Sequence, residues 1–247
     1  MKIPPRLRQF VSILRGTGWY PPRDYTAETL HLGSSYGGWT ILPQLLSSKS
    51  IVYSFGVGED ISFDLDLIGR YGCAIHAFDP TPKSLRWIEE QTLPREFVMH
   101  QYALARTDGA LELFAPANAE HASNSSLAGS AHLSGSSISV PAKRLDTIMR
   151  ELGHSRVDLV KMDIEGAEYG VIDSLERGGI APLQLLIEFH HRFAGAGLPA
   201  TKRAVNRLRE LGYLLYNVSA SGEDFSFVLA SEVKADGGGI EPAKTPP

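Results

Sequence analysis

Two short stretches of the sequence combine carboxylates with an imidazole at places where strands should end. "VKMDIEG" contains Asp163 and Glu165, and "LIEFHH" contains Glu188 and His190. A histidine can accept a proton near neutral pH, and a carboxylate can orient its ring. Carboxylates with one imidazole also suit a divalent cation such as Mg²⁺ or Mn²⁺. The two stretches therefore predict a site that removes a proton from a bound molecule, by a base or with a metal.

His190 is our candidate for the base. Period-two alternation along a strand places Glu188 and His190 on one face, so that Glu188 or Asp163 would orient the ring. A histidine at a strand end is as often a structural residue with satisfied hydrogen bonds, and that interpretation stays open. If a metal is bound, its ligands would come from Asp163, Glu165, Glu188 and His190, although no spacing in the sequence fixes such a set.

A second motif, "IVYSFGVGED", suits the binding of a nucleotide-containing cofactor. A strand that ends in Gly56, with Gly58 two residues later and a helix after Asp60, leaves backbone N–H groups uncovered at a helix start. Asp79 follows the next strand about 20 residues later, the spacing at which an acid accepts hydrogen bonds from ribose hydroxyls. A tight structural turn would not explain this pairing. The third fingerprint position is Ile61 rather than glycine, and the residues fit both NAD and S-adenosylmethionine (SAM).

These residues require a frame of alternating strands and helices, which the sequence predicts. Short β-rich runs alternate with helical stretches, over residues 51–55, 61–72, 73–79, 81–91, 96–104, 144–153, 157–163, 165–178, 183–189 and 200–212. Such alternation is typical of a parallel sheet with helices on both faces. The last two β-rich runs, 213–219 and 224–230, are joined by only four residues, so they must pair antiparallel. We expect an α/β, doubly wound, mostly parallel sheet with an antiparallel last strand.

The chain divides into a main domain with additions. Residues 1–45 hold two Pro-Pro pairs and a Gly-rich stretch, and are predicted as a helical extension packed over the edge of the core. Residues 46–232 form the main domain, with a small β insertion at about 107–141. A Ser- and Gly-rich tract inside the insertion, which includes His121 and His132, is predicted as a mobile loop. Residues 233–247 are predicted as a disordered tail.

Composition limits the classes of partner and location. The formal net charge is -4 and the basic residues are scattered, so we expect no nucleic-acid partner. The single cysteine, Cys73, lies in a strand-like run, which predicts a buried apolar role and no disulfide. No apolar stretch has the length of a secretory signal or a membrane span. We therefore expect a cytoplasmic protein with no membrane contact.

The stretch at residues 157–175 resembles the hallmark of the FkbM-type methyltransferases, which are class I SAM-dependent enzymes. Their pattern, Lys-x-Asp-x-Glu-Gly-x-Glu at a strand end, is matched by Lys161, Asp163, Glu165, Gly166 and Glu168. The resemblance extends over about residues 51–229 and implies a seven-stranded, Rossmann-like sheet of the class I type. Ser54 stands where many members carry an acid, and Asp60 where many carry a glycine.

The resemblance also implies how the donor lies. The methionine part of SAM would border the glycine turn at Gly56 and Gly58, and its ribose would bind Asp79. Its adenine would lie after the third strand, near Tyr102 and Ala103. Asp163 ends the strand expected beside the glycine strand, at the switch point where ligands of such sheets bind. There it could hold the donor's ammonium group or face the acceptor.

Several of these residues have structural explanations that are equally acceptable. Glu165 and Glu168 fall in the first turn of a helix, where negative charge is favoured. Lys161 could belong to a polar layer or extend from the strand to solvent. Tyr36 and Trp39 could cover the donor, although packing in the core is the favoured interpretation for Trp39.

The leading hypothesis is a SAM-dependent methyltransferase that methylates a hydroxyl on a small molecule, such as a sugar or a natural-product scaffold. The substrate class follows from the family resemblance alone. One alternative is an NAD-dependent oxidoreductase of the Rossmann type. Another is a SAM-binding or metal-binding protein without catalytic activity, which the altered glycine turn suggests. Acceptor identity, metal requirement and oligomeric state are not determined by the sequence.

Overall fold

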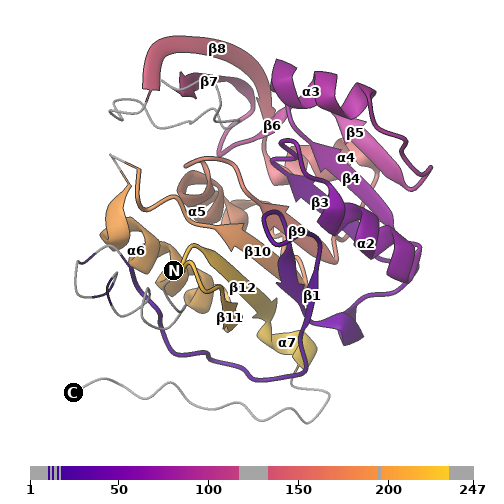
Figure 1. Cartoon of the computed structure of the whole chain (residues 1–247). Coiled ribbons are helices and arrows are strands. Elements are labelled where there is room, and N and C mark those ends of the chain that lie inside the picture. Colours follow the sequence, from indigo (N-terminus) through magenta and orange to yellow (C-terminus); the bar gives the residue numbers. More distant parts are fainter. Residues whose placement is uncertain are drawn as a thin grey trace, which may run out of the picture.

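The computed structural model describes residues 18–116, 133–193 and 196–233, with residues 11, 13 and 16 before them. At its centre is a seven-stranded sheet in the order β11–β12–β10–β9–β3–β4–β5 (Figure 1). Its strands are β3 (Ile51–Phe55), β4 (Ala74–Phe78), β5 (Phe97–His100), β9 (Leu159–Met162), β10 (Gln184–Glu188), β11 (Tyr213–Val218) and β12 (Asp224–Leu229). The pairs are parallel except those made by β12, which runs antiparallel to β10 and β11. The predicted mostly parallel sheet with an antiparallel last strand is confirmed.

Both faces of the sheet are covered, as a doubly wound fold requires. Side chains alternate along β3, so that Val52 belongs to one buried apolar cluster and Tyr53 and Phe55 to the other. The cluster around Tyr53 also contains residues of α4 (Leu145–Leu152), α5 (Glu168–Gly178) and α6 (Gly197–Glu210). The cluster around Val52 contains residues of α2 (Ser62–Tyr71), α3 (Pro82–Glu89) and the short α7 (Ala230–Val233). This two-sided burial holds the strand ends in fixed positions.

Local signals in the sequence mark several element boundaries. Gly72 follows α2 with a left-handed φ of +65°, a conformation that glycine adopts without steric cost. Thr81 precedes α3 and Pro82 occupies its first turn, where the missing N–H group is not needed. Cys73 is fully buried next to β4, as predicted.

The segment before β3 differs from the prediction. From residue 18 onward it forms an antiparallel hairpin, β1 (Leu30–Leu32) and β2 (Trp39–Ile41), followed by a 3₁₀ turn, η1 (Pro43–Leu45), in place of helices. The hairpin lies on a face of the sheet, over β10 and β12, rather than on its edge. Trp39 and Ile41 alternate with Thr40 along β2 and are buried against the sheet, which holds the hairpin on this face.

Polar contacts tie this hairpin to the sheet. The buried Gln184 side chain accepts from the Leu42 N–H at 2.8 Å and donates to the Leu42 carbonyl at 3.1 Å. The Thr40 carbonyl accepts hydrogen bonds from the hydroxyls of Tyr216 at 3.1 Å and Ser226 at 3.0 Å. Because a buried polar group without a partner is costly, these bonds specify the position of the segment on the sheet.

The predicted β insertion is a separate three-stranded sheet in the order β6–β8–β7. β6 (Ala103–Leu104) pairs parallel with β8 (Leu133–Lys143), and β7 (Gly109–Pro116) pairs antiparallel with it. Figure 1 shows β7 and β8 projecting beyond the carboxyl end of the central sheet. The insertion therefore stands beside the edge where the strands end.

Two predicted segments lie outside the described residues. They are the Ser-rich tract, of which residues 117–132 with His121 and His132 are not described, and the tail, of which residues 234–247 are not described. Across the described ranges, no helix is long and apolar enough to cross a membrane.

Three histidines lie together around Tyr53. His76 Nδ1 is 3.0 Å from His100 Nε2, and the His76 ring centroid is 4.8 Å from that of His154. The Tyr53 hydroxyl and His154 Nδ1 form a hydrogen bond of 2.7 Å. Burial, together with the charges of His154 and His100, lowers the pKa of His76 to about 4. Burial also lowers the pKa of His100, with Lys143 adding to the effect, and that of His154. The cluster is stable in its uncharged form.

We expect this cluster to make stability depend on pH. Between pH 6.5 and about 4 the unfolded chain binds a proton that folded His76 does not, so stability rises with pH across that window. The half-buried ring is partly screened by solvent, which leaves an effect of about 1–2 kcal/mol. On acidification from pH 7 to 4.5, the melting temperature of the wild type should fall further than that of His76→Gln. His31→Gln, on the exposed side of the hairpin, is the control, and equal slopes for wild type and His76→Gln would contradict the prediction.

Candidate active site

Gly56 forms the tightest point of the site. It follows β3 with φ +78°, donates its N–H to the Phe78 carbonyl at 3.0 Å and lies against the backbone of Asp163. A Cβ atom at this position would overlap the Asp163 carbonyl oxygen. Lys161 Nζ donates to the Gly56 carbonyl at 2.5 Å, and the Asp163 N–H donates to the Phe55 carbonyl at 3.1 Å. Glycine is required here both for its φ and for the close approach of the two strand ends.

Asp79 lies across the turn from Gly58. Its Oδ2 accepts from the Gly58 N–H at 3.0 Å, and its Oδ1 accepts from the N–H and the hydroxyl of Thr81 at 2.8 and 2.7 Å. Gly58 has φ +59°, and Ser84 donates to its carbonyl at 2.9 Å. Asp79 therefore fixes the glycine turn, and because each carboxylate oxygen has two lone pairs, acceptor capacity remains for a ligand.

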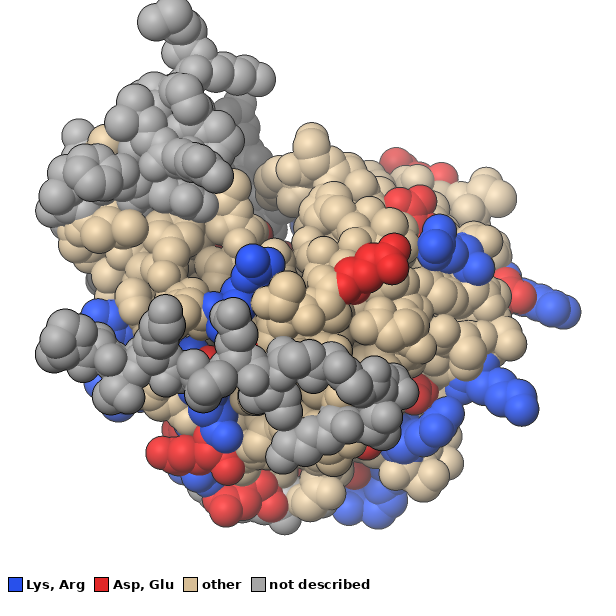
Figure 2. All heavy atoms as spheres, turned by 90° about the horizontal axis from the view of Figure 1, so that it is seen from below, with Lys and Arg blue, Asp and Glu red and all other residues tan. Residues whose placement is uncertain are grey.

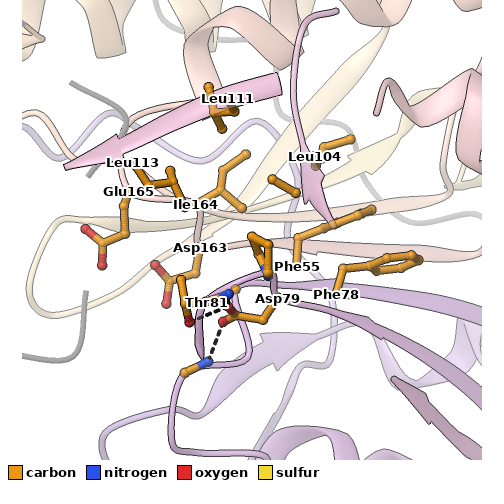
Figure 3. A pocket seen from close by; sticks show the side chains of 14 residues that line it. Phe55, Phe78, Asp79, Thr81, Leu104, Leu111, Leu113, Asp163, Ile164 and Glu165 are labelled. Carbon is orange, nitrogen blue, oxygen red and sulfur yellow. Dashed lines mark hydrogen bonds between the residues drawn. The ribbon is translucent and has the colours of Figure 1, made fainter. Parts of the chain in front are cut away.

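A pocket opens between these residues and the insertion (Figure 3). Gly56, Gly58, Asp79, Ala103 and Asp163, all predicted from the sequence, line it. The apolar wall of the pocket was not predicted from the sequence; it consists of Phe55, Phe78, Leu104, Leu111 and Leu113. The last two come from β7, and their alternation along that strand is the signal that could have indicated a shared face. A flat apolar ring with a polar sugar beside it would suit this combination.

The predicted place of Tyr102 near the adenine stays a prediction. Tyr102 is not among the residues that line the pocket. Its ring packs against Phe78, with centroids 5.4 Å apart, and the Lys143 ammonium lies 4.3 Å from its centroid. Tyr102 thus contacts Phe78, which lines the pocket, while Ala103 lines the pocket itself.

Lys161 belongs to a buried polar layer, one of its two predicted alternatives. Its side chain is almost fully buried, lies 5.7 Å from the Trp39 ring and faces Asp64 on α2. Burial raises the pKa of Asp64 to about 6, against the attraction of Lys161. Ser54 pairs with Lys161 across β3 and β9, and both side chains interact with Asp64. Trp39 itself is a core residue, 5% exposed.

Asp163, Glu165 and His190 come together where β9 and β10 end. His190 Nε2 is 3.6 Å from Asp163 Oδ1 and 3.3 Å from Glu165 Oε2. The hydrogen bond that holds the ring comes from Glu168 and not from the expected Glu188: its Nδ1 is 2.8 Å from Glu168 Oε1, while Asp163 contacts the other ring nitrogen. The expectation failed because β10 ends at Glu188, so strand alternation no longer applies at His190.

Glu168 has a second role in the same turn. It is fully buried, and its carboxylate accepts from the backbone N–H groups of Ile164 and Gly166. It opens α5, as the structural explanation from the sequence predicted. Glu165 lies before that helix, with φ +53°, the only non-glycine residue in the described ranges with a positive φ. The turn therefore directs Glu165 to the same side as Asp163, which Figure 3 shows.

The site is electrostatically unusual. Burial disfavours the charged form of His190, but Coulombic attraction and the hydrogen bond to Glu168, with Glu165 and Asp163, raise its pKa well above the usual value. Burial and the nearby Asp163 raise the pKa of Glu188 to about 9. Burial likewise raises the pKa of Asp224. Perturbed groups beside a pocket are characteristic of functional sites.

The family is identified by the sequence from β3 into β11. A profile described as the methyltransferase FkbM domain matches residues 51–215, more than half of the chain. The chain belongs to the FkbM methyltransferase family. The Lys-x-Asp-x-Glu-Gly-x-Glu stretch of this family, from Lys161 to Glu168, thus forms one wall of the pocket and the turn that holds His190.

Two curated relatives match this FkbM-family chain over part of their own length. A human protein named "Probable methyltransferase-like protein 24" is 26% identical over 191 residues, which is 74% of this chain and 45% of that protein. The Rattus norvegicus protein of the same name is 25% identical over 167 residues, 66% of this chain and 39% of that protein. The chain therefore spans less than half the length of these relatives.

Solved structures with similar folds include two archaeal fibrillarins. The Methanococcus jannaschii fibrillarin pre-rRNA processing protein matches 77% of this chain and 70% of its own, with a TM-score of 0.45 and 10% identity. Aeropyrum pernix fibrillarin, solved with natively bound SAM, matches 75% of this chain and 67% of its own, with a TM-score of 0.40 and 12% identity.

Proposed function

We propose that this FkbM-family chain is a SAM-dependent O-methyltransferase that acts on a hydroxyl of a small molecule, such as a sugar or a natural-product scaffold. The observation that carries the proposal is the double position of Asp163. It lines the pocket formed by the glycine turn and Asp79, and it belongs to the group with Glu165 and His190. A donor in the pocket would present its methyl group to an acceptor at that group.

The proposed residue roles follow from this arrangement. Gly56 and Gly58 leave room for the methionine part of SAM, and Asp79 accepts from the ribose hydroxyls. The apolar wall, with Ala103, holds the adenine. Transfer from a sulfonium is an in-line displacement on an activated donor, so much of the catalysis comes from positioning. The acceptor hydroxyl must also lose its proton, which a base or a bound cation can achieve.

The sequence prediction of His190 as the group that handles this proton stays a prediction, with a direct test. His190→Ala is expected to lower turnover by about 100-fold or more, the contribution of a positioned acid–base group. Its SAM dissociation constant should stay within about threefold of the wild type, because His190 is not among the residues that line the donor pocket. Isothermal titration with SAM and single-turnover transfer of a labelled methyl group measure the two effects. Unchanged turnover would remove His190 from the reaction.

The activity itself is tested with labelled SAM against a panel of sugars, polyols and hydroxylated macrocycles. S-adenosylhomocysteine and a methyl ether formed in equal amounts would support the proposal. Binding of SAM without turnover across the panel would favour a non-catalytic binding protein. Titration with NAD is the control for the oxidoreductase alternative, which a methyltransferase family match leaves without support.

One face of the protein gives no electrostatic support for a nucleic-acid acceptor. On the face seen in Figure 2, Lys and Arg are interspersed with Asp and Glu among the described residues, and they form no broad basic area. A phosphate backbone needs a concentrated positive surface. We propose a cytoplasmic location as well, which the single, buried and unpaired Cys73 supports.

A further inference from the structure

The group at the open end of the donor pocket has the composition of a cation site. Asp163 comes directly after β9, Glu165 lies in the following turn, and His190 comes just after β10. β9 and β10 are parallel neighbours, so their carboxyl ends lie at the same edge of the sheet. One ligand atom from each of the three side chains lies within 4.8 Å of the other two.

The separations match those between ligands of one metal ion. Mg²⁺ and Mn²⁺ bind oxygen or nitrogen at about 2.1 Å in octahedral geometry, which places adjacent ligand atoms about 3.0 Å apart and opposite ones about 4.2 Å apart. His190 Nε2 is 3.3 Å from Glu165 Oε2 and 3.6 Å from Asp163 Oδ1. Both distances lie between the values for adjacent and for opposite ligands of one ion.

His190 is already oriented as a metal-binding histidine is. A ligating histidine almost always donates its other ring N–H to a carboxylate, which fixes the ring. Here Nδ1 contacts Glu168 Oε1 at 2.8 Å, and the buried Glu168 carboxylate is itself held by backbone N–H groups. Nε2 is thereby directed at Asp163 and Glu165. Glu168 itself lies outside the group of three.

Lys161 lies near this group, but its ammonium donates a hydrogen bond outside it. Lys161 Nζ is 4.0 Å from Asp163 Oδ2, but it donates to the Gly56 carbonyl at 2.5 Å. Glu188 and Asp224 also lie close to this group: burial raises the pKa of both, and the charge of Asp163 raises each of them further. A small divalent cation would neutralise this concentration of carboxylates without filling the acceptor space.

We propose that Asp163, Glu165 and His190 bind one Mg²⁺ or Mn²⁺ ion, which holds an acceptor with two neighbouring oxygens, such as a vicinal diol. This inference rests on the proposed function. Three protein ligands leave three positions of an octahedron, enough for both acceptor oxygens. In this arrangement His190 is a ligand and does not act as the base, so the bound hydroxyl loses its proton to solvent water. Its oxygen then forms a bond to the methyl carbon as the carbon–sulfur bond breaks, and the electron pair stays on sulfur, which gives S-adenosylhomocysteine.

The first experiment measures Mn²⁺ alone, by electron paramagnetic resonance and isothermal titration on the EDTA-treated chain. The wild type should bind one Mn²⁺ saturably, and Glu165→Gln and His190→Gln should bind it at least tenfold more weakly. Glu223→Gln, which removes a nearby acid outside the group of three, should bind within about twofold of the wild type. Circular dichroism melts establish that each variant is folded. The proposal is overturned if the wild type shows no saturable Mn²⁺ binding, or if folded Glu165→Gln binds Mn²⁺ as tightly as the wild type.

A second experiment separates this inference from the proposed function. Methyl transfer to vicinal diols and to matched single alcohols is measured with and without Mn²⁺. Diol-selective transfer that needs the metal supports both proposals. Transfer that is equal with and without the metal overturns the cation site and leaves the methyltransferase in place. If the protein binds Mn²⁺ and SAM saturably but transfers no methyl group to any hydroxyl, the proposed O-methyltransferase activity is overturned. The proposed role of the metal in holding the acceptor is then overturned as well.

Discussion

Gly56→Ala is expected to abolish measurable SAM binding and to destabilise the fold. The new Cβ would overlap the Asp163 carbonyl oxygen, a backbone atom that cannot rotate away, and the φ of +78° adds strain for any residue with a side chain. Overlap and strain together cost about 3 kcal/mol or more, which lowers the melting temperature by roughly 6–12 °C in a chain of this size. Isothermal titration with SAM and a thermal melt measure both effects.

Gly58→Ala is the matched control for this substitution. Gly58 lies two residues further along the same turn, also with a positive φ, but nothing lies within 4 Å of the position its Cβ would occupy. We expect only the strain of the left-handed conformation, about 1 kcal/mol, and SAM binding that is weakened but measurable. If the two variants behave alike, the close approach of β3 and β9 is not what makes Gly56 necessary.

Asp79→Asn is expected to weaken SAM binding by about 10- to 100-fold. The substitution removes the negative charge that would accept the ribose hydroxyls, and hydrogen bonds to charged groups are each worth about 1.5–3 kcal/mol. It also leaves either Gly58 or Thr81 facing an amide NH₂ group, which cannot accept their hydrogen bonds. The expected change is in the SAM dissociation constant, with turnover at saturating SAM reduced much less.

Glu59→Gln provides the control for the Asp79 prediction. Glu59 is an acid in the same turn, but it is paired with Lys83 at the surface, and surface pairs contribute little. Its SAM affinity should equal that of the wild type within experimental error. An Asp79→Asn variant that binds SAM as tightly as Glu59→Gln would show that the ribose lies elsewhere.

The frame of the sheet was predictable because its signals are local. β3, β4 and β9 are short apolar runs that are followed directly by Gly56, Asp79 and Asp163. The antiparallel pairing of β11 and β12 follows from a link too short for any other connection. Position along such strands also predicts which residues reach the carboxyl edge, and for that reason Gly56, Asp79 and Asp163 were correctly brought to one pocket.

The hairpin over the sheet was not predictable in the same way. β1 and β2 are only three residues long, and the residues that hold them are distant in sequence. Gln184 and Tyr216, which bond to Leu42 and Thr40, are 142 and 176 residues away. Nothing in residues 18–45 alone specifies contacts of that range.

The orientation of His190 depends on where regular structure ends. Strand alternation applied to Glu188 but not beyond it, because β10 stops there. The true partner, Glu168, begins a helix and would ordinarily face solvent at its first turn. It is buried because the turn over residues 163–167 folds its carboxylate back onto backbone N–H groups. Asp64 was missed for a related reason, since its role depends on which face of α2 meets Lys161.

The stretch that matches the family is shorter than the stretch that folds together, because β2 and β12 pack on the sheet but lie outside the match. The family match covers residues 51–215, which begins after β2 and ends inside β11. It thereby omits β12, the strand wedged between β10 and β11, and the hairpin that seals the neighbouring face. A fragment cut at those limits would leave β11 with no strand to join and the apolar side of β10 open to water. Expression boundaries should therefore follow the sheet, not the match.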